Sequence, residues 1–184
     1  MPREPQIPTD PDWSVLHTET EYETGWYTGG YDEVEQPDGT AHRYYWASLP
    51  TAVVIVPVID DRVIFVEQYR PTIRHEQLEL PAGIVEDGES LSRAAQRELR
   101  EETGYAADGV SVLQELWVAT GVLRHQRAIV FAEGLTPVET DRDENEFLRV
   151  RSIPVSDAID AVRESPTNDA TLNGLYVAQD ENLL

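Results

Sequence analysis

The sequence of 184 residues contains no cysteine, no lysine and a single methionine. The absence of cysteine excludes a disulfide scaffold and a metal site built on thiolates. No apolar run approaches the roughly 18 residues that a membrane-spanning helix needs, and nothing at the N-terminus resembles a secretory signal peptide. These absences predict a soluble, cytoplasmic protein with no membrane partner, and the length suits one sizeable core.

Positive charge is also scarce, and all of it comes from arginine. Fourteen arginines stand against 35 aspartates and glutamates, which gives a formal net charge of -21. Such a negative surface repels nucleic acid, so we expect no nucleic-acid partner. It also repels itself unless salt screens it, because the Debye length falls to about 3 Å in 1 M salt. The chain could be an ordinary acidic enzyme, but its composition favours a cytosolic protein of an extreme halophile.

The most informative stretch is Gly83–Tyr105 (GIVEDGESLSRAAQRELREETGY). Its glycines at 83 and 88 predict turns, and the apolar period predicts a helix over 91–103. Gly104 stands where a left-handed helix C-terminus favours glycine. The aliphatic stripe of this helix continues into Glu98, Glu101 and Glu102, which lie within about 60° of one another around the axis.

Three carboxylates on one helical face need compensation. Glu98 and Glu102 are like charges four residues apart, which destabilises a helix by about 0.2–0.5 kcal/mol, and all three oppose the negative end of the helix dipole. A bound cation would relieve this repulsion, and hard oxygen ligands suit Mg²⁺ or Mn²⁺. The alternative is a solvated acidic face, which so acidic a chain could carry without any metal.

The spacing of eight residues in this stretch resembles the signature box of the Nudix hydrolases. The fixed positions of that box correspond to Gly83, Glu89, Arg97, Glu98, Leu99, Glu101, Glu102 and Gly104. One mild departure is Tyr105, where the family prefers an aliphatic residue. The resemblance implies an α/β/α sandwich with a mixed sheet, and metal-dependent hydrolysis of a nucleoside diphosphate linked to another group.

The N-terminal region carries a different pattern. Residues 1–20 are rich in proline, aspartate and threonine, which predicts a disordered or extended arm. Residues 21–49 predict an antiparallel β-hairpin, with strands over 22–34 and 41–49 and a turn between them. The hairpin holds more aromatic rings than a small ribbon can bury. Some should therefore pack on a second subunit, on a flat ligand or on the chain's own core; these rings are Trp26, Tyr27, Tyr44, Tyr45 and Trp46.

Residues 50–184 predict the Nudix domain itself. Strands are expected over 52–59, 62–68, 77–80, 110–118, 126–133 and 147–153. Two helices are expected after them, over 156–164 with Ser156 as its N-cap, and over 167–179. Together with the box helix, these elements give the α/β class, and we find no internal repeat.

Segments outside the box resemble the ADP-ribose pyrophosphatase branch of the family. They are Val66–Pro71, Glu79–Gly83 and Asp143–Glu146. The N-terminal hairpin fits as well, because in that branch it builds a swapped dimer and contributes to the partner's adenine site. One departure is the segment Val118–Gly121, which lacks the proline of the branch's Ser-Pro-Gly-like loop and so leaves the terminal sugar open.

The chemistry of pyrophosphate hydrolysis assigns roles to these residues. It requires a metal-activated water, neutralisation of phosphate charge and a base. Glu98 and Glu102 are the expected metal ligands and catalytic carboxylates, with Glu101 close by. Arg70 is fork-shaped and always charged, which suits a phosphate, although a surface ion pair is the alternative. An ion pair of Glu89 with Arg97 would orient the helix carboxylates, and Gly83 and Gly104 would shape the backbone at the two ends of the box.

Further roles are implied only by the resemblance. They are a metal-binding carbonyl at Ala82, a catalytic base at Glu144, a late metal ligand at Glu146, and substrate contacts at Tyr44, Trp46 and Glu79. The resemblance implies Mg²⁺ or Mn²⁺ as cofactor, and hydrolysis of an NDP-sugar, ADP-ribose first, to AMP and ribose 5-phosphate by a homodimer. A Nudix hydrolase acting on another nucleotide and a non-catalytic nucleotide-binding module remain as alternatives.

Overall fold

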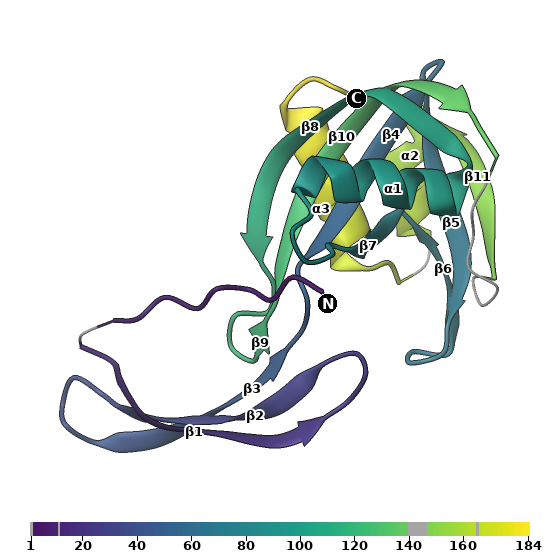
Figure 1. Cartoon of the computed structure of the whole chain (residues 1–184). Coiled ribbons are helices and arrows are strands. Elements are labelled where there is room, and N and C mark those ends of the chain that lie inside the picture. The colour runs from purple at the N-terminus through teal and green to yellow at the C-terminus, as the bar shows by residue number, and fades with distance from the viewer. Residues whose placement is uncertain (1, 11, 140–146, 165) are drawn as a thin grey trace.

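The computed structural model describes residues 2–10, 12–139, 147–164 and 166–184. In these ranges the chain forms a sandwich of helices on a mixed sheet, and a smaller sheet that projects from one end of it (Figure 1). No helix in these ranges is both long enough and apolar enough to cross a membrane.

The projecting sheet is built from the N-terminal region. Strands β1 (Ser14–Glu23), β2 (Thr28–Glu35) and β3 (Ala41–Ser48) form an antiparallel meander. The short strand β9 (Leu123–Arg124) pairs in parallel with the end of β3. The predicted antiparallel hairpin is present as β2 and β3, and the structure adds β1, most of which lies where the sequence predicted a disordered or extended arm.

The extended segment that precedes β1 returns to the sandwich. The Arg3 N–H donates to the Val85 carbonyl at 2.8 Å, and the Arg3 carbonyl accepts from the Thr51 N–H at 2.8 Å. Pro2 bridges Glu86 in the same antiparallel sense. The first residues of the chain therefore lie beside the turn that leads into the signature helix.

The sandwich sheet has the strand order β11-β5-β4-β10-β8, with β6 paired to β5 and β7 to β4. Its strands are β4 (Ala52–Ile59), β5 (Arg62–Arg70), β6 (His75–Glu79), β7 (Ala82–Ile84), β8 (Tyr105–Trp117), β10 (Gln126–Pro137) and β11 (Leu148–Pro154). The parallel pair β4 and β10 lies at its centre, and the other pairs are antiparallel. The predicted mixed sheet is confirmed, and β8 begins five residues earlier than the sequence indicated.

Both faces of this sheet are covered, which follows from the unbroken apolar runs in its central strands. In β4, Val53 and Ile55 pack against helix α1 (Leu91–Thr103), whereas Val54 and Val56 pack against the opposite layer. That layer consists of α2 (Val155–Arg163) and α3 (Asp169–Asp180). The α/β/α sandwich expected from the sequence is confirmed.

The helix ends follow local capping rules, with one correction. Ser90 caps α1 through a bond to the Arg93 N–H, and Gly104 closes the helix in the left-handed conformation at φ 72°. The prediction of Ser156 as the N-cap of α2 is wrong. The helix already begins at Val155, Pro154 is its N-cap, and the Ser156 hydroxyl donates to Asp157 instead. Strand β11 ends at Pro154, and the helix begins at the next residue, where the Val155 N–H donates to the Asp61 carbonyl at 3.0 Å.

Candidate active site

The α1 helix brings two charged side chains into the protein interior. Glu98 is 9% exposed and Glu102 is 7% exposed, and both lie on the face that continues from Ala94 and Ala95. Burial of carboxylates costs free energy unless opposite charge or hydrogen bonds compensate it. The helix face therefore changes from apolar packing to buried charge within two turns, as its sequence predicted.

The short strand β7 accommodates these two carboxylates. The Ala82 N–H donates to Glu102 Oε2 at 3.0 Å. A Cβ atom at Gly83 would lie 1.9 Å from Glu98 Cδ, so only glycine leaves room for the Glu98 carboxylate against the backbone. Glu98 and Glu102 thus meet adjacent residues of β7, Gly83 and Ala82 respectively, which pair with Val53 and Val54 of β4.

Arg97 balances part of this charge through three ion pairs. Its guanidinium bonds Glu98 at 2.7 Å, Glu89 at 3.0 Å and Glu101 at 3.1 Å, and it also donates to the Ile84 carbonyl at 2.8 Å. These contacts raise the pKa of Arg97 above its ordinary value, the bond to Glu89 contributing most. Burial alone would raise the pKa of Glu89, but its bonds to Arg97 and to the Glu86 N–H lower it overall. The predicted pair of Glu89 and Arg97 is present.

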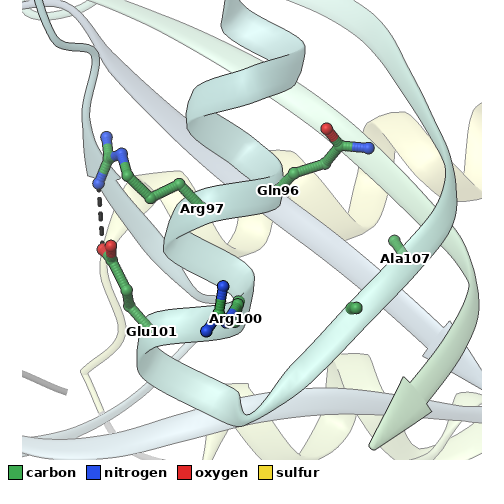
Figure 2. A pocket seen from close by; sticks show the side chains of 6 residues that line it. Gln96, Arg97, Arg100, Glu101 and Ala107 are labelled. Atoms are coloured by element: carbon green, nitrogen blue, oxygen red, sulfur yellow. Dashed lines mark hydrogen bonds and ion pairs between the residues drawn. The ribbon is translucent and has the colours of Figure 1, made fainter. Parts of the chain in front are cut away.

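Arg97 also lines two hollows on the surface around α1. Figure 2 shows one of them, where Arg97 pairs with Glu101 and where Gln96 and Arg100 lie along the helix opposite Ala107 of β8. The second hollow is lined by Glu98 and Arg97 together with Pro2, Ile84, Glu86 and Asp87. Of these two hollows, the second contains a carboxylate of the buried pair, so it is the candidate catalytic pocket.

The charge of this cluster fits a divalent cation. Three carboxylates, those of Glu89, Glu98 and Glu101, pair with the single guanidinium of Arg97, and a fourth, that of Glu102, accepts from the Ala82 N–H. All four are hard oxygen donors, and the missing side chain of Gly83 lets the Glu98 carboxylate lie against the backbone beside Ala82. Among the described residues, no three acidic or histidine side chains form a ready-made metal cage. Magnesium does not require one, because it binds one or two carboxylates and keeps several waters.

A second buried carboxylate, Glu79, lies at the end of β6 and is 4% exposed. Arg70 of β5 donates to it from Nε at 3.0 Å and from Nη2 at 2.5 Å. Gln68 and Asn168 donate to it as well, at 3.0 and 2.6 Å. The structure therefore brings together Arg70 and Glu79, which the sequence had proposed separately as substrate-binding residues.

The two aromatic residues proposed for substrate binding lie in the N-terminal sheet. The Trp46 indole N–H donates to Asp32 at 3.1 Å, and the Arg124 guanidinium stacks on its ring at 4.0 Å from the centroid. The Tyr44 hydroxyl accepts from Gln36 at 2.6 Å. Within the chain, both residues are thus held by their own sheet, and any contact of theirs with a ligand remains a prediction.

Two of the predicted residues, Glu144 and Glu146, lie outside the described ranges. The structure also shows residues that the sequence analysis did not single out. Asn168 bonds Glu79, and Asp32 of β2 pairs with Arg124 of β9 within the N-terminal sheet. Asn168 had a local signal, since asparagine just before a helical period favours an N-cap. Its bond to Glu79, 89 residues away, had none.

Comparison with known proteins agrees with this geometry. The NUDIX domain model matches residues 48–172. The ADP-ribose pyrophosphatase of Bacillus subtilis (strain 168) is 33% identical over 142 residues, which cover 76% of this chain and 77% of that protein. The ADP compounds hydrolase NudE of Escherichia coli (strain K12) is 29% identical over 171 residues, or 91% of each chain.

Solved structures lead to the same family. A crystal structure of an ADP compounds hydrolase superposes with a TM-score of 0.84 at 26% identity, covering 97% of this chain and 100% of the other. The chain therefore belongs to the NUDIX family, and its complete signature box makes it a Nudix pyrophosphohydrolase.

Proposed function

We propose that this protein hydrolyses the diphosphate bond of ADP-ribose, with a divalent metal, to give AMP and ribose 5-phosphate. The observation that carries this proposal is the buried pair Glu98 and Glu102 against Ala82 and Gly83, in an intact Nudix box. Two of the relatives that cover three quarters or more of the chain are an ADP-ribose pyrophosphatase and an ADP compounds hydrolase, which supports an ADP-containing substrate.

The residues of the box would bind the metal and hold its carboxylate ligands in place. Glu98, Glu101, Glu102 and the Ala82 carbonyl would hold Mg²⁺ or Mn²⁺. A bound ion supplies charge neutralisation on the phosphate oxygens and a water of lowered pKa. Arg97 keeps the helix carboxylates in place through its contacts with Glu89 and Glu98.

Residues outside the box would bind the diphosphate and accept the proton of the attacking water. Arg70 offers its guanidinium to the diphosphate, since 44% of its side chain is exposed although Glu79 holds one edge. Glu144 would accept the proton of the attacking water, and Glu146 would join the metal when substrate is present. Water adds across the P–O–P bond, and each product keeps one phosphate.

The N-terminal sheet supports a second part of the proposal, a homodimer. Every residue of β1 is exposed, and large apolar side chains lie open on this sheet and on the loop between β1 and β2, among them Val15, Leu16, Trp26 and Tyr45. A second copy paired through this surface would bury them, and two-fold symmetry is the commonest arrangement. In such a dimer Tyr44 or Trp46 would contact the adenine. A chain that lacks residues 1–48 should then be monomeric in sedimentation and should bind nucleotide more weakly.

The charge composition supports a salt-rich cytoplasm as the setting. With a net charge of -21, the protein needs screening that ordinary buffers do not give. Assays of the proposed activity should therefore contain molar KCl.

The substrate is tested by a panel of nucleotides assayed with Mg²⁺ in molar KCl. ADP-ribose, ADP-glucose, UDP-glucose, a dinucleoside polyphosphate and a nucleoside triphosphate would be compared by kcat/KM, with the products identified by chromatography. The proposal predicts the highest kcat/KM for ADP-ribose, with AMP as a product. A clear preference for the triphosphate or the dinucleoside polyphosphate would contradict it.

A further inference from the structure

Asn168 joins two elements that meet beside the proposed phosphate-binding arginine. It is the N-cap of α3, where its Oδ1 accepts from the Thr171 N–H at 2.7 Å. Its Nδ2 donates to Glu79 Oε1 at 2.6 Å. Both polar atoms of the amide are hydrogen-bonded. The oxygen accepts from the Thr171 N–H, and the nitrogen donates to the Glu79 carboxylate, which can only accept when it is ionised. The orientation of this amide is therefore fixed by its two partners.

The end of β6 is held against α3 by further contacts. Thr171, which is 1% exposed, accepts the Leu80 N–H at 3.1 Å through its hydroxyl. A Cβ atom at Gly174 would lie 2.5 Å from Leu80 Cδ1, so the helix approaches the chain closely at this point. The α3 N-terminus thus has a defined position relative to Glu79, which lies only three residues before Ala82.

Glu79 in turn fixes the orientation of the Arg70 guanidinium. Its Oε2 receives Nε at 3.0 Å and Nη2 at 2.5 Å, and Nε also lies 3.3 Å from Oε1, so the carboxylate holds this edge of the guanidinium through two nitrogens. In the described ranges, Nη1 donates to no residue, and the side chain is 44% exposed. One edge of the guanidinium is fixed by protein, and the other edge remains for a ligand.

From these contacts we infer that Asn168 is a positioning residue for the proposed reaction. It holds the Glu79 carboxylate, and through Glu79 it holds the Arg70 guanidinium in the orientation that receives the diphosphate of the substrate. This inference rests on the proposed function, and it adds a residue of α3, outside the signature box, to the machinery that binds the substrate.

A simpler role for Asn168 is helix capping alone, and substitutions at this residue separate the two roles. Serine and aspartate both cap helices well, so Asn168→Ser and Asn168→Asp keep the bond to the Thr171 N–H. Serine is too short to reach Glu79, and aspartate places a carboxylate against a carboxylate. Asn168→Ala loses both bonds, and Asn173→Ala, at an exposed position of the same helix, is the matched control.

The experiment measures kcat and KM for ADP-ribose and the melting temperature of each variant. Asn168→Ser should melt close to the wild type, yet raise KM about five- to tenfold, because Arg70 stays paired with Glu79 and only part of the effect of a lost hydrogen bond to a charged group reaches the substrate. Asn168→Asp should raise KM further, because like charges repel, while kcat changes less than KM in both variants. Asn173→Ala should leave KM unchanged.

Two results would overturn the inference. One is a wild-type KM in both Asn168→Ser and Asn168→Asp, which would mean that only the cap matters. The other is a fall in kcat with KM unchanged, which would assign Asn168 to the chemical step.

A second measurement does not depend on turnover. The NMR signal of the Arg70 Nε–H should exchange with water faster in Asn168→Ser than in the wild type. If the wild type does not cleave ADP-ribose, the proposed function fails, but this exchange rate still decides the inference. Unchanged exchange would show that Asn168 does not hold Arg70.

Discussion

His125 shows at the scale of a single residue how burial determines a pH response. It is 6% exposed, its Nε2 accepts from Arg127 Nε at 3.1 Å, and its Nδ1 has no hydrogen-bond partner among the described residues. Burial lowers the pKa of His125, and the positive charge of Arg127 lowers it further. The folded protein therefore keeps this histidine neutral at a pH where the unfolded chain protonates it.

The direction of the effect on stability follows from this lowered pKa. Between the folded pKa and the unfolded value of about 6.5, the unfolded state binds more protons, so stability falls as the pH falls below about 6.5. We expect the melting temperature to drop by a few degrees between pH 7 and pH 5.5, and Asn in place of His125 should flatten this slope. The same substitution at the exposed His42 is the control. An equal slope in wild type and His125→Asn would contradict this assignment.

At the scale of an element, the contact of β7 with α1 depends on Gly83. A Cβ atom there would lie 1.9 Å from Glu98 Cδ. We expect Gly83→Ala to displace the Glu98 carboxylate, to cost about 1–3 kcal/mol of stability by overpacking, and to abolish most activity. Thermal melting and the ADP-ribose assay measure the two effects.

Gly25, in the loop between β1 and β2, is the control for that substitution. A Cβ at Gly25 meets no atom within 4 Å. Gly25→Ala should therefore shift the stability by less than about 0.5 kcal/mol. Full activity and an unchanged melting temperature in Gly83→Ala would show that Glu98 does not lie against this backbone.

The elements that the sequence predicted well are those with local signals. The helix over 91–103 has its apolar period and its terminal glycine close together in the sequence, and the structure matches both ends. Strand β1 was not predicted, because its side chains are exposed along its whole length and no alternation of apolar and polar residues marks a buried face. Residue preference alone favours Ser156 as the cap, and it does not detect that the helix begins directly after the strand that ends at Pro154.

The residues of the candidate site also differ in whether a local sequence signal predicts their position. The positions of Glu98, Glu102 and Gly83 followed from spacing, although the turn predicted at Gly83 is wrong, since this residue lies in the short strand β7. The bonds of Asn168 to Glu79 and of Arg124 to Asp32 join residues 89 and 92 positions apart. Only the packing of α3 and β9 brings those partners together, and no periodic pattern encodes that packing.

At the scale of the whole molecule, the net charge of -21 predicts a strong dependence on salt. The Debye length is about 10 Å in 0.1 M salt and about 3 Å in 1 M, so repulsion among the acids grows on dilution. We expect the melting temperature and the activity to fall in 0.1 M KCl and to recover in molar KCl. Differential scanning calorimetry over a KCl series measures the effect.

A variant with fewer acids separates screening from other effects of salt. Glu21 and Glu23 are exposed residues of β1, and changing both to glutamine removes two negative charges from the surface. This variant should show a smaller salt dependence than the wild type. Equal stability and full activity of the wild type in 0.1 M and molar KCl would remove the support for a salt-rich cytoplasm.

The central claim is that this protein cleaves ADP-ribose with a metal held by α1, and one assay tests it most directly. It measures AMP release from ADP-ribose with Mg²⁺ in molar KCl for the wild type, Glu102→Gln and a matched surface control, Glu115→Gln. Glu115 is an exposed residue of β8.

We expect turnover by the wild type that a chelator abolishes, and turnover by Glu115→Gln at the wild-type rate. We expect a kcat at least about a hundredfold lower in Glu102→Gln, since even residues that only support a metal ligand cost about 10- to 100-fold when they are replaced. The fold of Glu102→Gln should be intact by circular dichroism. Release of AMP by Glu102→Gln at the wild-type rate, or release that persists after chelation, would contradict a metal-dependent reaction at α1.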